Sequence, residues 1–345
     1  MYLHPEKVKV VVNDCAGLGK TKRYSRAIDR EIRKVKEEMV IRIDRENTEK
    51  HGHKNAKEIT KRAIQEGYDF IVGICGDGTD NEITNGMVEA EKSVPLAPHK
   101  GGIGNDLIHN ANKEFKDGRK IPAGPNWFFK RLRKQGGKIS EEDIVVIDVL
   151  TMTFIDENGK KKKIAALNGI SLGADAEVND TAVRWKDNRI IRALAIIPLV
   201  PKTIYVIAAL SKILKFWKPL YSELRIDYNG KQGDYQEVCM IIANNGEKYG
   251  AVFYPAPGKS MRSGKMAICI TKKMPRWKLV IGIILLMFGK HTLLREITML
   301  ETESATIRSR QPVYCQWDGE PWLLPPGEYK LEVLKQVLPV YIPSK

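Results

Sequence analysis

The chain has 345 residues, of which 43% are hydrophobic, and its 57 Lys and Arg outnumber 42 Asp and Glu to give a formal net charge of +15. This composition excludes a mainly disordered chain, and the length favours about two domains. The longest uncharged apolar run, Leu279–Phe288, is about half of the ~20 residues that a spanning helix needs, which argues against a conventional transmembrane protein.

In its first half, the chain alternates β-branched runs with charged, helix-like stretches. In chain order we expect a strand at Val8–Val12, a glycine-bearing turn at Asn13–Lys20, a helix to about Glu38, a strand at Val40–Ile43, a helix at Asn55–Glu66, a strand at Phe70–Ile74 and a helix at Asn81–Glu89. Such alternation predicts a doubly wound parallel sheet whose ligand site lies at the carboxyl ends of the strands.

From about Asp143 the pattern changes to a period of two, which is typical of antiparallel strands. We expect strands at Ile144–Val149, Lys163–Leu167, Glu237–Ile242, Met266–Ile270 and Tyr329–Leu334, and apolar helices at Ile190–Phe216, with a break at Pro198 and Pro201, and at Trp277–Phe288. We therefore predict an α/β domain over 1–142, a β domain over 143–325, and a tail, 326–345, that returns to the first domain.

The charge and the cysteines indicate the surroundings in which the chain works. The positive excess predicts an anionic partner, and the basic runs at 130–134 and 160–163 are more typical of solvated loops than of a nucleic-acid surface. We therefore expect no nucleic acid. The five scattered cysteines form no Cys-X-X-Cys pair and favour a reducing, cytoplasmic compartment: Cys15, Cys75, Cys239, Cys269 and Cys315.

The run Gly76-Asp77-Gly78-Thr79-Asp80-Asn81-Glu82 follows an apolar strand and precedes a helix. Glycines there let the backbone approach phosphate oxygens and adopt positive φ, and the helix N-terminus offers N–H donors. A plain type I′ turn at Asp77-Gly78 is the alternative, which the strand-loop-helix context disfavours.

Two further glycine segments resemble phosphate loops. Gly101–Asp106 again precedes a helical segment, although alone it fits a flexible turn equally well. Gly19-Lys20-Thr21 invites a P-loop interpretation, but the first glycine of that motif falls on Asp14, so the spacing fails.

Gly169-Ile170-Ser171-Leu172-Gly173 matches the nucleophile elbow of hydrolases, with Asp175 or Asp234 and His291 downstream. The elbow needs a helix directly after it, whereas 174–178 alternates like a strand, so we reject this interpretation. The pair His51 and His53 lacks other metal ligands at suitable spacing, and a loop is favoured.

Near the C-terminal end, Asp318-Gly319-Glu320 places two carboxylates beside a glycine at a strand end. A carboxylate within reach of a substrate hydroxyl takes the proton as that hydroxyl attacks a phosphoryl group. The same three residues also fit an ordinary turn.

Together, these motifs resemble in order the diacylglycerol kinase catalytic-domain family of lipid kinases, which includes bacterial diacylglycerol, sphingosine and ceramide kinases. The resemblance rests on Thr48–His53, Gly67–Asp69, Gly76–Glu82, Asn85-Gly86, Gly102–Asp106, Ser171–Ala176, Ala243–Asn245, Tyr249-Gly250, Pro257-Gly258 and Asp318–Glu320. The Gly-Asp-Gly-Thr element is shared with NAD kinases and phosphofructokinases, but the later motifs are not.

The resemblance implies an α/β nucleotide-binding domain, like that of NAD kinases and diacylglycerol kinases, and an antiparallel β-sandwich domain, with ATP between them. It implies catalytic roles for Asp318, Glu320 and Asp77, with the proton acceptor among these three left open. The nucleotide contacts that it implies are Asn13, Gly17, Thr48, Gly76, Asp77, Gly78, Thr79, Asn81, Glu82, Gly104 and Asn105.

Several positions depart from the family pattern. Asp14-Cys15-Ala16 replaces the Pro-X-Ser of the opening motif, Cys75 replaces a glycine, and Ile103 replaces a threonine. The family's Asp-Asp-Gly, which serves a separate Mg²⁺ in bacterial members, reads Arg262-Ser263-Gly264. We expect that Mg²⁺ site to be weak or lost, while Mg²⁺ is still needed with ATP.

The sequence thus predicts an ATP-dependent lipid kinase, with diacylglycerol as an example of the acceptor, that associates peripherally with an anionic membrane. The helices at Ile190–Phe216 and Trp277–Phe288 fit an acyl-chain pocket or the membrane interface, although core packing explains either one alone. A kinase of a soluble acceptor and a catalytically decayed nucleotide- or lipid-binding protein remain alternatives, and dimerisation is left open.

Overall fold

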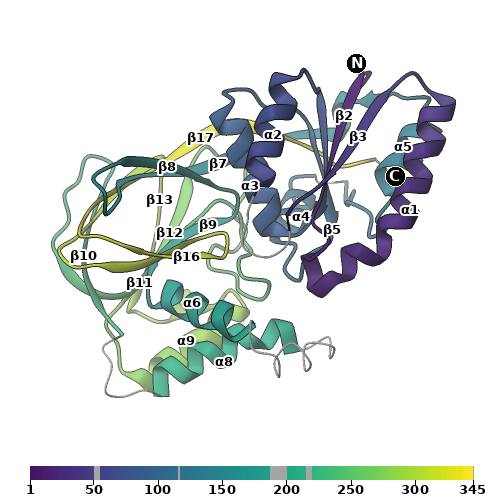
Figure 1. Ribbon diagram of the computed structural model, residues 1–345. Helices are drawn as coiled ribbons and strands as arrows, with labels where there is room; N and C mark the ends of the chain where they lie inside the picture. Colours follow the sequence, from purple (N-terminus) through teal and green to yellow (C-terminus); the bar gives the residue numbers. More distant parts are fainter. Residues whose placement is uncertain (50–54, 116, 187–199, 215–219, 345) are drawn as a thin grey trace. The chain divides into compact units, whose positions relative to one another are not determined.

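The computed structural model describes residues 1–49, 55–115, 117–186, 200–214 and 220–344 (Figure 1). The chain divides into two compact units, one formed by Met1–Ile147 with Gln336–Lys345 and the other by Asp148–Lys335. The sequence placed this boundary near residue 142 and the start of the tail at 326. The predicted histidine pair and the first part of the helix predicted from Ile190, with Pro198, lie outside the described residues.

The first unit is an α/β domain. Its elements are β1 (Tyr2–Leu3), β2 (Lys7–Val12), α1 (Ala16–Glu38), β3 (Arg42–Asn47), α2 (Ala56–Gln65), β4 (Phe70–Cys75), α3 (Asp77–Glu89), β5 (Leu96–Lys100), α4 (Asp106–Asn112), α5 (Trp127–Lys134), β6 (Ile139–Ser140), η1 (Glu141–Asp143) and the start of β7 (Ile144–Ile155). The parallel order β3-β2-β4-β5 confirms the predicted doubly wound class.

The order in which strands are added to this sheet reverses between β2 and β4. β3 is added on one side of β2, and β4 and then β5 are added on the other. α1 packs against α5 and α2 against α3, and Figure 1 shows the two pairs on opposite faces of the sheet. Every residue of β4 is buried, as expected for a central strand that is covered on both faces.

The end of β17 (Gly327–Tyr341) completes this unit, because Val340 pairs in parallel with Leu96 of β5. The ring of Tyr341 stacks on Trp127 at 5.6 Å and meets the edge of Phe70 at 6.0 Å. Beyond the strand, the Ile342 N–H donates to the Asp143 carbonyl at 2.7 Å, so the tail is held by both rings and backbone.

The second unit is antiparallel β with helices. Its elements are the rest of β7, β8 (Lys161–Ala166), β9 (Gly169–Gly173), α6 (Ala174–Lys186), α8 (Val200–Leu214), β10 (Ser222–Tyr228), β11 (Gln236–Asn244), β12 (Met266–Lys272), α9 (Arg276–Met287), η2 (His291–Leu293), β13 (Ile297–Thr302), β14 (Ser304–Ser309), β15 (Val313–Trp317), β16 (Glu320–Leu324) and the first part of β17. Along the sheet the order is β16-β15-β9-β11-β10-β14-β17, with β12 beside β11 and β7 beside β17.

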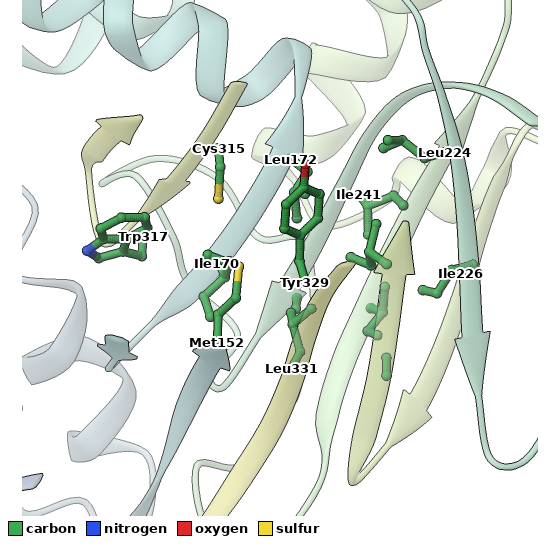
Figure 2. Packing of buried hydrophobic residues seen from close by; sticks show 14 of the residues in the cluster. Met152, Ile170, Leu172, Leu224, Ile226, Ile241, Cys315, Trp317, Tyr329 and Leu331 are labelled. Carbon is green, nitrogen blue, oxygen red and sulfur yellow. The ribbon is translucent and has the colours of Figure 1, made fainter. Parts of the chain in front are cut away.

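One large apolar cluster fills the sheet domain. Figure 2 shows side chains from β7, β9, β10, β11, β15 and β17 converging, among them Met152, Ile170, Leu224 and Tyr329. A smaller cluster that includes Ile213 and Leu279 lies beneath α8 and α9. Among the helices within the described ranges, none has the length and apolarity needed to cross a membrane.

Several local predictions were wrong. The segment predicted to alternate as a strand after Gly173 is helix α6, and the basic run at 130–134 lies in helix α5, whose apolar face is buried. α1 begins at Ala16 and α3 at Asp77, several residues before the predicted starts. The strand predicted at Val40–Ile43 is found at Arg42–Asn47, with Val40 fully exposed.

Asp143 is the polar anchor of the tail, which generates a stability prediction. Its carboxylate is 1% exposed and accepts hydrogen bonds from Arg119 Nη1 at 3.0 Å and from the Ser344 backbone N–H at 2.9 Å. We expect Asp143→Ala to lower the free energy of unfolding of this unit by about 1–3 kcal/mol, because it removes the buried one of the two carboxylates that pair with Arg119 and leaves the Ser344 N–H without this acceptor. Urea unfolding measures the effect.

Asp117 supplies the matched control for this prediction. It pairs with the same Arg119 at 2.6 Å, but its side chain is 52% exposed. Asp117→Ala is expected to cost less than about 1 kcal/mol. Equal losses in both variants would contradict the anchoring role of Asp143.

Candidate active site

The loops that follow β4 and β5 approach each other backbone to backbone at Gly76 and Gly102. A Cβ built on Gly76 would lie 2.9 Å from the Gly102 Cα, and one on Gly102 would lie 2.8 Å from the Gly76 Cα. Gly76 has an extended conformation and not the positive φ expected from the sequence. The reason for glycine at these two positions is therefore close approach, which leaves two backbone loops packed at the carboxyl edge of the sheet.

Asn13 joins the loop after β2 to the helix after β4. Its Nδ2 donates to Thr79 Oγ1 at 2.8 Å, and its backbone N–H donates to the Ile74 carbonyl at 3.1 Å. These two strands flank the point at which the strand order reverses, where doubly wound sheets bind their ligands. Gly17 follows in the first turn of α1 with a φ of 57°, a left-handed value that favours glycine.

Asp77 is the first residue of α3, so the expected loop at 76–81 is largely the first turn of a helix and not a type I′ turn. Its Oδ1 accepts the Leu107 N–H at 3.2 Å, which ties α3 to the start of α4. Asn105 caps α4 with a left-handed φ of 50° and exchanges two hydrogen bonds of 3.1 Å with the backbone of Gly102. The second glycine loop is thus held from both sides.

A buried acid lies one turn further along α3. Asp80 is 2% exposed, and burial together with the charge of Asp77 raises its pKa well above the usual range, so the neutral acid is favoured. The Cys75 thiol, which stands where the family has glycine, donates to Asp80 Oδ1 at 3.2 Å. Burial also raises the pKa of Cys75, so this thiol stays protonated.

The remaining predicted nucleotide contacts also lie at the carboxyl edge of the sheet, and each has a different local role. Glu82 Oε2 accepts the Ala56 N–H at 3.0 Å and caps α2. Thr48 follows β3, and its N–H donates to the Val12 carbonyl at 2.8 Å, beside Asn13. Asn81 accepts from Asn85 Nδ2 at 2.8 Å within α3, Gly78 lies in the same helix, and Gly104 lies between β5 and α4.

In the second unit, Asp318-Gly319 forms the two-residue turn between β15 and β16. Both residues have positive φ, 46° and 92°, and Trp317 pairs directly with Glu320, which defines a type I′ hairpin. The Asp318 carboxylate accepts three consecutive backbone N–H groups, those of Leu167 at 2.5 Å, Asn168 at 2.8 Å and Gly169 at 3.1 Å. Asp318 therefore anchors the segment between β8 and β9.

Two side chains that no sequence motif marks, those of Gln316 and Asn179, hold the other half of this turn. The Gly319 N–H donates to Gln316 Oε1 at 2.8 Å, and Asn179 Nδ2 of α6 donates to the Gly319 carbonyl at 2.8 Å. Gln316 could have been suspected from the sequence because it lies two residues before Asp318. Asn179 has no such signal, since it is 140 residues away from Gly319 in the chain. Glu320, half-buried at the start of β16, follows directly from this fixed turn.

Gln316 also joins the turn to a buried carboxylate. Its Nε2 donates to Asp175 Oδ2 at 3.0 Å, and the same oxygen accepts Ser171 Oγ–H at 2.6 Å and Tyr249 O–H at 3.1 Å. Burial raises the pKa of Asp175, and these three donors oppose that shift. The network extends from the sheet through Asp175 to the Asp318 turn.

The nucleophile elbow is excluded by a different reason from the one expected. A helix does follow Gly173, so the predicted strand at 174–178 was wrong. Ser171 is instead fully buried in β9, between β11 and β15, and its hydroxyl donates to Asp175. A serine in this position offers no nucleophile to a substrate.

The segment Arg262–Gly264 does not fit a cation site. The nearby buried carboxylate, Asp148, accepts the Gly264 N–H at 2.6 Å, and Ser263 Oγ donates to the Lys265 carbonyl. Lys335 methylenes lie about 3.3–3.7 Å from the position of a Gly264 Cβ. Cation binding needs converging oxygens, and in the part of the chain that the structure describes, no cluster of three His, Cys, Asp or Glu is arranged to hold a metal.

Comparison with known proteins agrees with both halves of this architecture. Residues 7–123 match the diacylglycerol kinase catalytic domain, and residues 168–342 match the YegS C-terminal NAD kinase beta sandwich-like domain. The protein named "Putative lipid kinase YtlR" of Bacillus subtilis (strain 168) is 24% identical over 314 residues, which are 90% of this chain and 92% of that protein.

Solved structures show the same fold. A structure from Bacillus anthracis str. Sterne, described as a "putative diacylglycerol kinase", covers 99% of both chains with a TM-score of 0.68 at 19% identity. A second structure from that organism, described as one of its "diacylglycerol kinases", covers 99% of this chain and 98% of its own with a TM-score of 0.63 at 17% identity.

The contact between the glycine loops generates a binding prediction. In Gly76→Ala the new methyl group meets the Gly102 backbone, so one loop must move. We expect ATP affinity to fall at least about tenfold, because phosphate binding by backbone loops depends on their position. Isothermal titration with ATP measures the change.

Gly124→Ala is the matched control, since its Cβ meets only Asn126 Oδ1, at an ordinary 3.8 Å. This variant is expected to bind ATP as the unaltered chain does. Retained affinity in Gly76→Ala, with a native unfolding midpoint, would argue against nucleotide binding at these loops.

Proposed function

Because the chain belongs to the diacylglycerol kinase catalytic-domain family of lipid kinases, we propose that it transfers the γ-phosphate of ATP to the hydroxyl of a lipid such as diacylglycerol. The observation that carries the proposal is the Asp318-Gly319-Glu320 turn, which is fixed by Gln316, Asn179 and the backbone amides of 167–169. A carboxylate presented from a rigid turn suits proton transfer, which needs a positioned base.

We assign nucleotide binding to the first unit. The loops at Gly76 and Gly102 and the first turns of α1 and α3 offer backbone and helix ends to the phosphates, with Asn13 and Thr79 between them. Mg²⁺ bound with ATP supplies neutralisation of the triphosphate charge, and Asp77 is the carboxylate at the α3 end of these loops.

We assign the proton acceptor to Glu320. Both oxygens of Asp318 already accept backbone N–H groups, which favours an anchoring role for that carboxylate. As the lipid hydroxyl oxygen bonds to the γ-phosphorus, its proton passes to the Glu320 carboxylate, the bond to the β-phosphate oxygen breaks, and ADP leaves.

The assay that tests the function follows labelled γ-phosphate from ATP with Mg²⁺ into an organic-extractable product. The acceptors are diacylglycerol, sphingoid bases, ceramide and total membrane lipids in micelles. Label in the lipid phase is expected. Label confined to a soluble product would replace the lipid by a soluble acceptor, and ATP binding without transfer to either phase would indicate a decayed kinase.

For Glu320→Gln we predict a fall in kcat of at least about 100-fold with unchanged ATP affinity, because the amide cannot take the proton. Glu328→Gln serves as the control, since Glu328 is an exposed carboxylate of the same unit that pairs with Arg308 at 2.6 Å. Near-normal turnover in Glu320→Gln would refute the assignment of the base.

Asp318→Ala tests the anchoring role separately. It removes the acceptor of three backbone N–H groups, and we expect the free energy of unfolding of the second unit to fall by about 1–3 kcal/mol. Glu320→Gln should leave that free energy nearly unchanged in the same urea titration. A stable Asp318→Ala variant would show that the turn does not depend on this carboxylate.

A further inference from the structure

Helix α9 is apolar on both of its faces. Leu279 and Leu286 are buried on the side that packs into the sheet domain. The opposite side is a stripe at spacings of four, three and four residues that remains exposed, and Leu293 of η2, 75% exposed, lies just beyond its end. The α9 stripe consists of Trp277 (63% exposed), Ile281 (40%), Ile284 (51%) and Phe288 (73%).

Such a surface needs a partner that shields it from water. A helix that is hydrophobic all round is normally buried, and single exposed apolar residues are ordinary, whereas a continuous row of large side chains is not. Trp277 and Phe288 stand at the two ends of the row, and the helix is about 18 Å long at 1.5 Å per residue. This length suits a helix lying on a surface.

The charges around the stripe indicate what kind of partner fits. Between residues 272 and 295 the chain has six basic side chains and no acidic one. Lys272, Lys290 and Arg295 are exposed. Lys278 lies 5.8 Å from the centre of the Trp277 ring. The basic side chains of this segment are Lys272, Lys273, Arg276, Lys278, Lys290 and Arg295.

Acidic neighbours neutralise only part of this charge. Glu237 pairs with Lys273 at 2.6 Å, and Glu296 lies near both Lys278 and Arg295. An excess of positive charge beside an apolar face complements an anionic lipid surface, where each cation near the headgroups adds to the attraction. A second copy of this basic segment would instead repel it.

We propose that the α9 stripe inserts into the headgroup and acyl boundary of an anionic phospholipid bilayer, with the surrounding lysines and arginines on the headgroups. Aromatic and aliphatic side chains enter the apolar layer while the charged heads stay at its surface. The proposal concerns membrane binding and does not need turnover, although a lipid acceptor would give this surface its use.

The first test measures sedimentation of the full-length protein with phosphatidylglycerol-containing vesicles and with phosphatidylcholine vesicles. Binding to the anionic vesicles is expected, together with weaker binding to the neutral ones. Ile284→Ser with Phe288→Ser should lower the partition coefficient at least about tenfold. The matched control is Ile155→Ser, which alters an equally exposed isoleucine elsewhere, 53% exposed, and should bind as the unaltered chain does.

The second test reverses charges. Lys290→Glu with Arg295→Glu should weaken binding to anionic vesicles and reduce its salt dependence, whereas Lys161→Glu with Lys163→Glu, at an exposed basic cluster on β8, should not. The unfolding midpoint of each variant confirms its fold. The Glu320→Gln variant, which we expect to be inactive, should still bind the anionic vesicles. The vesicle assay can therefore be interpreted even if the proposed kinase activity is wrong.

Two outcomes would overturn the proposal. One is equal vesicle binding by the stripe variant and the unaltered chain, which would place the membrane contact elsewhere. The other is a dimer in light scattering that Ile284→Ser with Phe288→Ser dissociates, without vesicle binding by either protein, which would make the stripe an interface between copies of this chain.

Discussion

The backbone contact between Gly76 and Gly102 is the constraint on which the first unit depends. β4 and β5 are neighbours, so the segments leaving their carboxyl ends start side by side, and they remain close because neither has a side chain at the contact. Gly101 is equally confined, since a Cβ there would lie 2.4 Å from the Cys75 carbonyl oxygen. The result is a concentration of backbone amides and helix starts, which is the chemistry that phosphates require.

In the second unit, the carboxylate motif lies at the turn of the hairpin between β15 and β16, and this turn is held in place by its surroundings. A type I′ turn sets the backbone of Asp318 and Gly319, but a hairpin by itself is free to bend. Asp318 ties it to the amides of 167–169, and Gln316 and Asn179 hold the Gly319 peptide on both sides. Asp318 therefore holds the position of the turn, which is consistent with the proposal that Glu320 is the proton acceptor.

The order of the α/β elements was predicted well from the sequence, because strongly apolar strands such as Phe70–Ile74 alternate with charged helices. The prediction was wrong where the pattern of side chains does not match the secondary structure that the backbone adopts. The segment after Gly173 alternates small and polar residues, yet forms α6 because it packs on β15 and β16. Asp77 and Gly78 suggest a loop, but a helix start accepts both. The charges at 130–134 favoured a solvated loop, although the segment is a helix that buries Trp127, Phe128 and Leu132.

Within the candidate site, the acids and glycines could be predicted from residue types, but the groups that bond to them could not. The donors to Asp318 are backbone amides, which every residue except proline carries, so no sequence pattern marks 167–169 as their source. The same limit applies to Leu107, whose N–H meets Asp77. Gln316 shows the converse, because a glutamine in a strand has no distinctive meaning until its two ends are seen on Gly319 and Asp175.

Two of the departures from the family pattern are accommodated by neighbouring groups, which bears on whether the site has decayed. Cys75, in place of glycine, supplies a thiol that satisfies the buried Asp80, and Gly73 leaves the space that this acid occupies, since a Cβ there would lie 2.8 Å from Asp80 Oδ1. At Arg262–Gly264, where the family has Asp-Asp-Gly, Asp148 accepts the Gly264 N–H, and Lys335 packs against that glycine. A buried polar group left without a hydrogen-bond partner costs about 1–3 kcal/mol. Both substituted positions thus keep hydrogen-bonded local structure, and this favours the proposed kinase over a decayed one.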